Sequence, residues 1–166
     1  MIQNDLGEKI LHEIRSGICI VAPHLKIAFL NQSLERNAQV SGAIGKDFFE
    51  VFPNLDKHIY RDRLRQVLEG GPPFVFSPKI HKCLIPFPEA EQAYFTQECY
   101  LSAAIDPNTK KTYALFTVHD LTHQNRRMKE LRGLNKLKDR LMSVCSHDLK
   151  TPLNAILGFS EIMLMD

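Results

Sequence analysis

The sequence predicts an α+β protein, in which a five-stranded antiparallel sheet with helices on one face is followed by a long C-terminal coiled-coil helix. Strand-like stretches are grouped near both ends of residues 17–122, with short helical pieces between them. Residues 123–166 show no strand pattern, and their leucines recur at steps of three and four. A length of 166 residues suits one ordinary domain with a helical extension.

The first elements are a helix and a hairpin. Residues 5–15 carry apolar side chains at helical spacing, with Asp5 as the expected N-cap and Gly17 just past the end. Two apolar stretches follow, 18–22 and 25–30, separated by a turn too short for anything but a hairpin.

The middle of the chain predicts helices and then three more strands. Residues 32–53 form short helical pieces around a buried aromatic cluster, and residues 56–69 form a longer helix that ends at two glycines. We expect the strands over about 74–84, 94–105 and 112–119. Because the chain returns to the sheet after the helices, the first strand is expected beside the last.

The C-terminal part predicts a coiled coil. Leu131, Leu134, Leu137, Leu141 and Val144 follow one another at steps of three, three, four and three. The sequence therefore divides into an N-terminal amphipathic helix (1–16), a sheet domain (17–122), a linker helix (123–140) and a last helical segment (141–166).

Charge is unevenly distributed along the chain. The net charge is +2, but residues 123–140 hold seven Lys/Arg against two Asp/Glu, a local +5. We interpret this stretch as a solvated helical connector. Nucleic-acid binding ranks below that interpretation, because a leucine stripe stands where aromatic or base-reading residues would be expected.

The composition excludes several other classes. The longest apolar runs are far too short to span a membrane, and the polar N-terminus has no signal-peptide pattern, so we expect a cytoplasmic protein without membrane contact. The four cysteines are scattered and lack zinc spacing, which predicts reduced thiols and no metal site.

Five pieces of the sequence resemble a PAS domain. They are Gly17-Ile-Cys-Ile-Val, Ile27-Ala-Phe-Leu-Asn, Gly45-Lys-Asp-Phe-Phe, Val67-Leu-Glu-Gly and the closing strand Tyr113–Thr122, which ends in Asp-Leu-Thr. The resemblance covers residues 12–122 and implies a sensor domain with a PAS-like five-stranded sheet. The Asp-x-Thr ending resembles the junction by which PAS domains join an outgoing helix.

A second resemblance lies in the C-terminal segment. Residues 138–156, with the core Ser146-His-Asp-Leu-Lys-Thr-Pro-Leu, closely resemble the phosphoacceptor box of sensor histidine kinases. The resemblance implies that residues 141–166 begin the dimerisation and phosphoacceptor domain. It also implies three roles: His147 as acceptor, Asp148 as acid/base and Thr151 as a residue that assists dephosphorylation. The phosphate would then pass to an aspartate of a response-regulator receiver domain.

The residue chemistry fits these roles. Histidine titrates near neutrality, so a useful fraction is neutral and nucleophilic. His147 falls between apolar positions, which directs it outward, and Thr151 lies one helical turn further on. Pro152 removes a backbone donor, so we expect a helix kink there that lets the upper helix pivot. Adjacent Ser146, His147 and Asp148 point in different directions and cannot form a hydrolase triad.

The segment is expected to be inactive alone. No glycine-rich nucleotide lid follows His147, so ATP and Mg²⁺ would be bound by a missing ATP-binding domain of a longer kinase. The apolar stripe of the C-terminal helix predicts a homodimer. The expected partners are therefore a second copy, the ATP-binding domain and a receiver domain.

A ligand pocket in the sheet domain is a separate hypothesis. Its expected walls are aromatic and aliphatic and would suit a small apolar or heterocyclic molecule, namely Phe48, Phe49, Phe52, Tyr60 and Leu64. The same residues would serve equally well as plain core. No cysteine stands in a flavin-photoreceptor motif. His58 is placed for a haem ligand, but its polar neighbours favour a solvent-facing residue.

Three functions remain in competition at this level. The first is the signal-input and phosphoacceptor segment of a two-component sensor histidine kinase, in which the sensor controls phosphorylation of His147. The second is a non-catalytic PAS module for dimerisation or ligand binding, with a scaffolding helix. The third is a nucleic-acid binder. The box over residues 146–153 favours the first.

Overall fold

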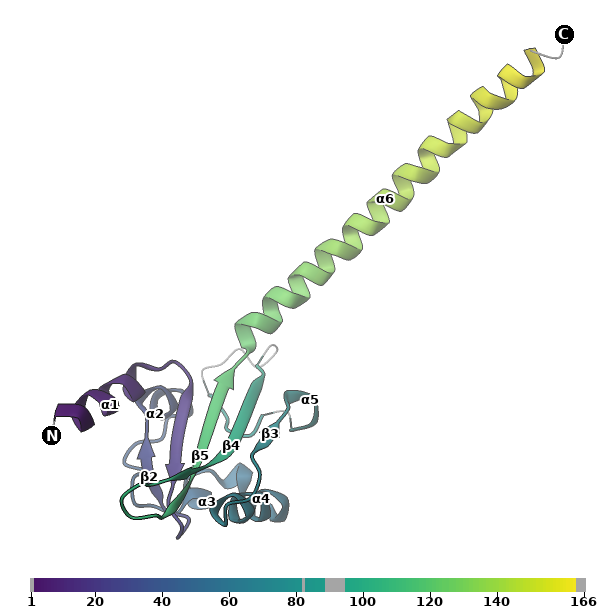
Figure 1. Cartoon of the computed structure of the whole chain (residues 1–166). Helices are drawn as coiled ribbons and strands as arrows, with labels where there is room; N and C mark the ends of the chain where they lie inside the picture. Colours follow the sequence, from purple (N-terminus) through teal and green to yellow (C-terminus); the bar gives the residue numbers. More distant parts are fainter. Residues whose placement is uncertain (1, 82, 89–94, 164–166) are drawn as a thin grey trace. The chain divides into compact units, whose positions relative to one another are not determined.

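The computed structural model describes residues 2–81, 83–88 and 95–163. The chain divides into two compact units, Met1–His123 and Gln124–Asp166. The first unit holds the sheet and its helices, and the second consists of most of one long helix (Figure 1). Among the described residues, no helix combines the length and apolar character that a membrane span requires.

Two strands near each end of the sheet domain enclose a mostly helical middle part. In chain order the elements are α1 (Ile2–Glu13), β1 (Gly17–Val21), β2 (Ile27–Leu30), α2 (Gln32–Ala38), α3 (Phe48–Val51), the 3₁₀ helix η1 (Pro53–Leu55), α4 (His58–Leu68), β3 (Phe74–Phe76), α5 (Pro78–His81), β4 (Gln97–Ile105), β5 (Thr112–Asp120) and α6 (Thr122–Met163).

The five strands form one antiparallel sheet in the order β2-β1-β5-β4-β3. The first strand therefore lies beside the last, as predicted, with Cys19 opposite Phe116. The longest pairing joins β4 to β5, from Gln97 opposite Asp120 to Ile105 opposite Thr112. This arrangement confirms the predicted fold class.

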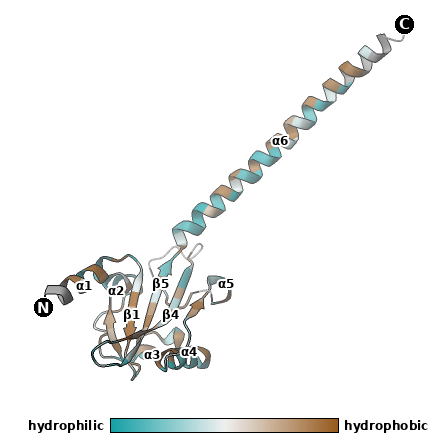
Figure 2. Cartoon of the chain, in the orientation of Figure 1, coloured by the Kyte–Doolittle hydropathy of each residue, from teal (hydrophilic) through white to brown (hydrophobic). Residues whose placement is uncertain are grey.

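The core lies between one face of the sheet and the helices. Alternate residues of β4 and β5 are buried, as the period of a β-strand requires, whereas four of the five residues of the interior strand β1 are buried. Helix α2 contacts β1, and α4 contacts β4 and β5. Figure 2 shows the apolar character of the strands, whereas the turns of α6 alternate between hydrophilic and hydrophobic. Among the residues that the structure describes, 21 form one buried cluster, so this unit has a core of its own.

A buried asparagine fixes the start of the sheet. The Asn31 side chain accepts hydrogen bonds from the backbone N–H groups of Ile18 and Leu34, and it donates to the carbonyl oxygens of Leu11, Ile14 and Ser16. It thereby caps α2 and joins the end of α1 to β1. The hydrogen bonds of this one side chain therefore connect α1, β1 and α2.

Gly17 makes a close approach possible at the same place. A Cβ atom built on Gly17 would lie 2.8 Å from the Leu34 side chain and 3.3 Å from that of Val118. A larger residue at position 17 would have to displace the buried Leu34 side chain, so this glycine, which was expected after the first helix and in the first PAS-like piece, also serves packing.

The strand expected over residues 74–84 is wrong beyond Phe76. Pro78 begins the short helix α5, because its fixed φ and missing N–H suit a first helical turn better than a strand. Ile85 then hydrogen-bonds through its backbone to the Gln97 side chain, which is itself buried. This segment is therefore tied to the sheet by a side chain and not by strand pairing.

Several boundaries also differ. Helix α1 begins at Ile2, so Asp5 lies inside it and is not its N-cap, and it ends at Glu13. The strand expected from Tyr94 begins at Gln97 within the described part, while Tyr94 itself lies outside the described residues. The second strand begins at Ile27. Leu25 before it has a positive φ of 62°, which is incompatible with a strand.

The long helix begins at the predicted Asp-x-Thr junction. The Asp120 carboxylate accepts hydrogen bonds from the Thr122 backbone N–H, at 2.8 Å, and from its hydroxyl. The Thr122 hydroxyl in turn accepts from the backbone N–H of Thr96. The last strand and the first turn of α6 are therefore held together by side chains.

Candidate functional site

The predicted acceptor lies on the exposed surface of α6. The His147 side chain is 83% exposed, and its Nδ1 atom lies 3.5 Å from a carboxylate oxygen of Asp148, at the outer limit of a hydrogen bond. The carboxylate is thus near one ring nitrogen. Nε2, at the far end of the ring, is the nitrogen left for a reaction partner.

Thr151 lies one turn beyond His147 on the same side of the helix. Its hydroxyl donates to the His147 backbone carbonyl at 3.1 Å. In this rotamer the hydroxyl bonds to the backbone and not to the imidazole ring. A rotation about χ1 would release it while keeping the residue adjacent to the histidine.

Pro152 affects the same stretch of backbone. It lacks an N–H group, so the carbonyl of Asp148 has no donor four residues further on. The helix nonetheless continues through Pro152 to Met163. The expected pivot at this residue stays a prediction.

The apolar side chains of α6 form two stripes. At about 100° per residue, an upper apolar stripe and a lower one lie on faces roughly 110° apart. The upper stripe consists of Leu134, Leu137, Leu141 and Val144, and the lower stripe of Leu149, Leu153 and Ile156; all seven are exposed in the single chain. His147 lies roughly 100° or more from the centre of either stripe, so neither would cover it when buried.

The residues predicted to line a ligand pocket are brought together in the first unit. Phe48, Phe49, Phe52 and Leu64 are buried, and Tyr60 is half-buried against them. The ring of Phe48 contacts those of Phe49 and Phe52, with centroids 5.3 Å apart in each pair. The structure therefore places four of the five in the closely packed core.

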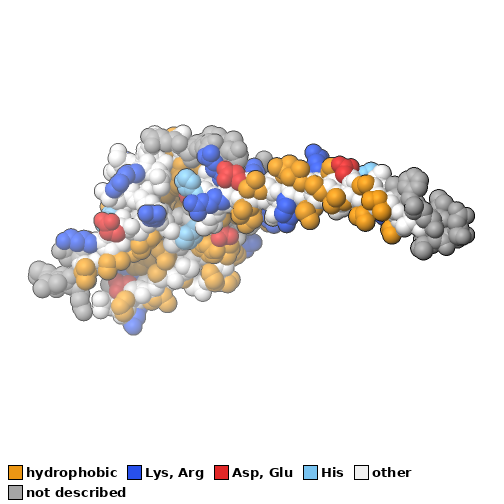
Figure 3. All heavy atoms as spheres, turned by 90° about the horizontal axis from the view of Figure 1, so that it is seen from above, with side chains coloured by type: hydrophobic (Ala, Val, Ile, Leu, Met, Phe, Trp, Pro, Cys, Tyr) orange, Lys and Arg blue, Asp and Glu red, His pale blue; other side chains and the backbone are white. Residues whose placement is uncertain are grey.

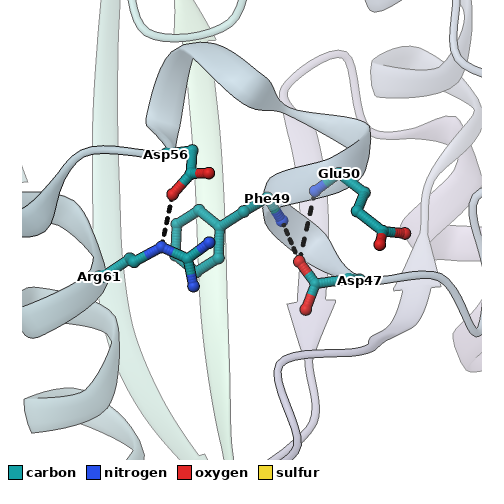
Figure 4. Close-up of polar contacts among 5 residues, drawn as sticks. All are labelled: Asp47, Phe49, Glu50, Asp56 and Arg61. Atoms are coloured by element: carbon teal, nitrogen blue, oxygen red, sulfur yellow. Dashed lines mark hydrogen bonds and ion pairs between the residues drawn. The ribbon is translucent and has the colours of Figure 1, made fainter.

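A guanidinium covers this cluster from outside. Arg61 lies over the Phe49 ring at 4.2 Å and pairs with Asp56 at 2.5 Å, while Asp47 caps α3 by accepting from the N–H groups of Phe49 and Glu50 (Figure 4). The hydrogen bond from Arg61 lowers the pKa of the Asp56 carboxyl. These contacts hold α3 and α4 together across the aromatic core.

Tyr60 faces a polar partner that the sequence did not reveal. Its hydroxyl lies 3.3 Å from Nδ1 of His81, and the rings of Tyr60, Phe76 and His81 are in mutual contact. Burial, and then the nearby Cys99 thiol, raise the pKa of Tyr60. His81 was expected on a strand. The proline three residues before it was the signal that it lies on a helix.

His58 stands at the exposed start of α4. Its side chain is 93% exposed, and Nδ1 lies 2.7 Å from the Asp62 carboxylate. This position matches the solvent-facing interpretation and engages one ring nitrogen with a neighbour on the same helix. Among the residues that the structure describes, no three His, Cys, Asp or Glu side chains are grouped as metal ligands would be.

A comparison of the sequence with family models identifies the family of the first unit. The family model of the PAS fold matches residues 11–126, about two thirds of the chain. The chain belongs to the PAS-fold family. The model of the His Kinase A (phospho-acceptor) domain matches residues 137–166, which include His147. This PAS protein is the signal-input and phosphoacceptor segment of a sensor histidine kinase.

Two solved structures with TM-scores above 0.5 agree on the fold. The PAS domain of BvgS from Bordetella pertussis is 11% identical, with a TM-score of 0.55 over 82% of this chain and 98% of that one. An RNA-binding Light-Oxygen-Voltage receptor is 14% identical, with a TM-score of 0.51 over 84% of this chain and 38% of that one. A sensory box sensor histidine kinase from Vibrio cholerae is 19% identical, with a TM-score of 0.48 over 72% and 91%. No curated protein sequence matches the chain.

Proposed function

We propose that this PAS protein receives a phosphoryl group on His147 and passes it to an aspartate of a receiver domain, under control of the PAS domain. The observation that carries the proposal is the phosphoacceptor-domain match over residues 137–166, within which His147 is exposed and lies away from both apolar stripes. An acceptor must be open to large partners while the rest of its helix is packed.

The chemistry begins on the imidazole ring. Asp148 near Nδ1 favours the tautomer with its proton on that nitrogen, and Nε2 then attacks the γ-phosphorus of ATP. An N–P bond forms, the bond to the bridging oxygen breaks, ADP leaves, and Asp148 takes up the Nδ1 proton as the ring gains positive charge. The ATP and Mg²⁺ are supplied by an ATP-binding domain, so the segment is inactive alone. In the second step a receiver carboxylate attacks, and the N–P bond breaks.

Thr151 assists the hydrolysis of phosphorylated His147. When its hydroxyl turns from the His147 carbonyl, it can orient a water molecule toward the phosphorus. Hydrolysis then returns the free histidine and inorganic phosphate. Its role is in positioning, so its loss slows dephosphorylation without removing the acceptor.

The active form is a homodimer through α6. Each buried leucine contributes roughly 1.5–3 kcal/mol, and the two apolar stripes hold seven apolar side chains per copy. A second copy covers the upper apolar stripe in a parallel pair and leaves both His147 side chains outside.

The PAS domain controls this helix through the junction at its start. Strand β5 lies at the centre of the sheet and leads directly into Asp120 and Thr122, whose hydrogen bonds fix the first turn of α6. A change in the sheet that alters these bonds would change how α6 begins, and so how its stripes pair.

The test uses the chain mixed with a separately made ATP-binding domain and labelled ATP. We expect label on the wild-type chain, none on His147→Gln, and none on the chain incubated with ATP alone. Thr151→Ala should take up label normally and lose it several-fold more slowly. Label on the His147→Gln chain would contradict the assignment of the acceptor. A dimeric chain that takes no label would favour a scaffolding role.

A further inference from the structure

Helix α6 is held at its start and again further along, with a less supported stretch between the two places. At the start, Thr122 is bonded to Asp120 and to the backbone of Thr96. Further along, the upper apolar stripe begins at Leu134 and would be buried in the proposed dimer. Residues 124–133, which we call the hinge segment, lie between the junction and this stripe.

The hinge segment is polar and largely exposed. Its apolar residues Met128 and Leu131 lie roughly 160° and 100° from the centre of the upper apolar stripe, and both are exposed. Arg126 and Glu130 pair at 3.2 Å, but both side chains are exposed, and Arg before Glu is the less favourable order along a helix. Figure 3 shows hydrophobic side chains along α6 with separate Lys and Arg side chains beside them. A stretch this short is marginal without packing, because isolated helices need about 12–15 residues to be stable in water.

Gly133 ends the hinge segment and lowers its helical stability further. Glycine has the lowest helix propensity of any residue except proline, because it loses the most backbone freedom on folding. A Cβ atom built on Gly133 would meet nothing within 4 Å beyond its chain neighbours and the backbone of the helix. No contact that the structure describes therefore requires glycine here, and local opening of the helix explains the residue better than packing does.

The leucine spacing changes at the same place. Leu131, Leu134 and Leu137 follow one another at two successive steps of three, whereas a regular coiled coil alternates steps of three and four. An extra step of three overwinds a coiled coil locally. Regular pairing of two copies therefore begins only beyond the hinge segment and adds little stability to the segment itself.

We propose that α6 opens locally at the hinge segment, and that this opening limits how much of a change at the start of α6 reaches His147. The second half of the proposal rests on the proposed function, in which the PAS domain controls phosphorylation of His147. A continuous helix passes a rotation or tilt of its first turn along its length, whereas an open segment absorbs it. The population of the open form therefore sets the strength of the control.

Amide hydrogen exchange of the dimeric chain tests the opening. We expect the amides of residues 124–133 to exchange at least about tenfold faster than those of residues 137–146 in the wild type. Gly133→Ala should slow exchange in the hinge segment about four- to fivefold, as the difference in helix propensity between the two residues requires. The control Gly7→Ala makes the same substitution in α1, where the added Cβ also meets nothing within 4 Å, and should leave the hinge segment unchanged.

Three results of this experiment would overturn the proposal. The first is equal exchange along α6 in the wild type, and the second is unchanged exchange in the Gly133→Ala chain. The third is a dimer weakened by Gly133→Ala in sedimentation, because Gly133 would then be a packing residue of the dimer interface.

Labelling of His147 by a separately made ATP-binding domain tests the transmission. Asp120→Asn weakens the bonds that start α6, and its effect on the labelling rate should be at least about twofold larger in the Gly133→Ala background than in the wild type. The Gly7→Ala background should not enlarge it. Equal effects in the Gly133→Ala chain and the wild type would overturn the transmission step. Absence of label on the wild-type chain would instead overturn the proposed function, and hydrogen exchange would still decide whether the hinge segment opens.

Discussion

The two units of this protein treat apolar side chains in opposite ways. In the PAS unit Phe48 is only 3% exposed, enclosed by helices and sheet from the same chain. On α6 Leu137 is 54% exposed, and the other residues of the upper apolar stripe are exposed as well. The PAS unit therefore completes its core alone, whereas the stability of α6 depends on a second surface.

The difference extends to how each unit places its functional groups. The orientation of His147 follows from helical periodicity alone, because its neighbours on the helix fix the faces. The contact between Tyr60 on α4 and His81 on α5 joins two residues that are 21 positions apart in the sequence. A local rule builds the phosphoacceptor face, and long-range packing builds the sensor core. The predictions below test this contrast.

The largest effect is expected at the dimer face. Leu141→Asp places a charge in the upper apolar stripe of both copies, so the loss of two buried leucines should weaken the dimer by roughly 3–6 kcal/mol, or at least a hundredfold in Kd. Sedimentation or light scattering across micromolar concentrations measures it. The control Ser143→Asp lies off both stripes and should leave the dimer intact. A wild-type monomer at these concentrations would contradict the proposal that a second copy covers the upper apolar stripe.

The next effect is expected in the closed core. Phe48→Ala removes a ring that contacts three other aromatic rings, so the free energy of unfolding of the PAS unit should fall by about 3–5 kcal/mol. Urea denaturation followed by circular dichroism measures the change. Ile80→Ala, at an exposed position, is the matched control and should change stability by less than about 0.5 kcal/mol. Similar losses for both variants would argue against an enclosed core.

A smaller effect is expected at the tie between α1 and the sheet. Asn31→Ala leaves buried backbone groups of Ile18 and Leu34 without their partner, which should cost about 1–3 kcal/mol. Amide hydrogen exchange should also show faster exchange in α1 and α2 than in β4 and β5. Uniform acceleration across the sheet would mean that Asn31 supports the whole unit and not this corner.

The smallest effect is a difference in the reactivity of the cysteine thiols, which needs no change in stability. Burial raises the pKa of Cys99 to about 12 and raises that of Cys19 further, so at pH 8 both are protonated, enclosed and unreactive. Cys145 on α6 is exposed. We expect a thiol reagent to modify Cys19 and Cys99 only in denaturant, whereas Cys145, which lies between the two apolar stripes, should react faster in the Leu141→Asp variant than in the wild-type dimer. Mass spectrometry of the labelled peptides measures the order, and rapid labelling of Cys19 would contradict the closed core.

The sequence by itself determined most features that depend on near neighbours. The strands of the sheet domain and the exposed face of His147 follow from alternation and helical spacing. These patterns are local, so they can be read from consecutive residues. The phosphoacceptor box was identified in another way, from the resemblance of consecutive residues 146–153 to a family pattern.

Only the tertiary structure shows which side chains from distant segments contact one another. The strand expected to reach Leu84 stops at Phe76, because Pro78 starts a helix and the Gln97 side chain captures the following segment. Arg61 lies over the ring of Phe49, and Tyr60 has His81 as its partner. Such contacts are selected by the packing of distant segments against one another, and no spacing within the sequence encodes which of several compatible partners will be closest.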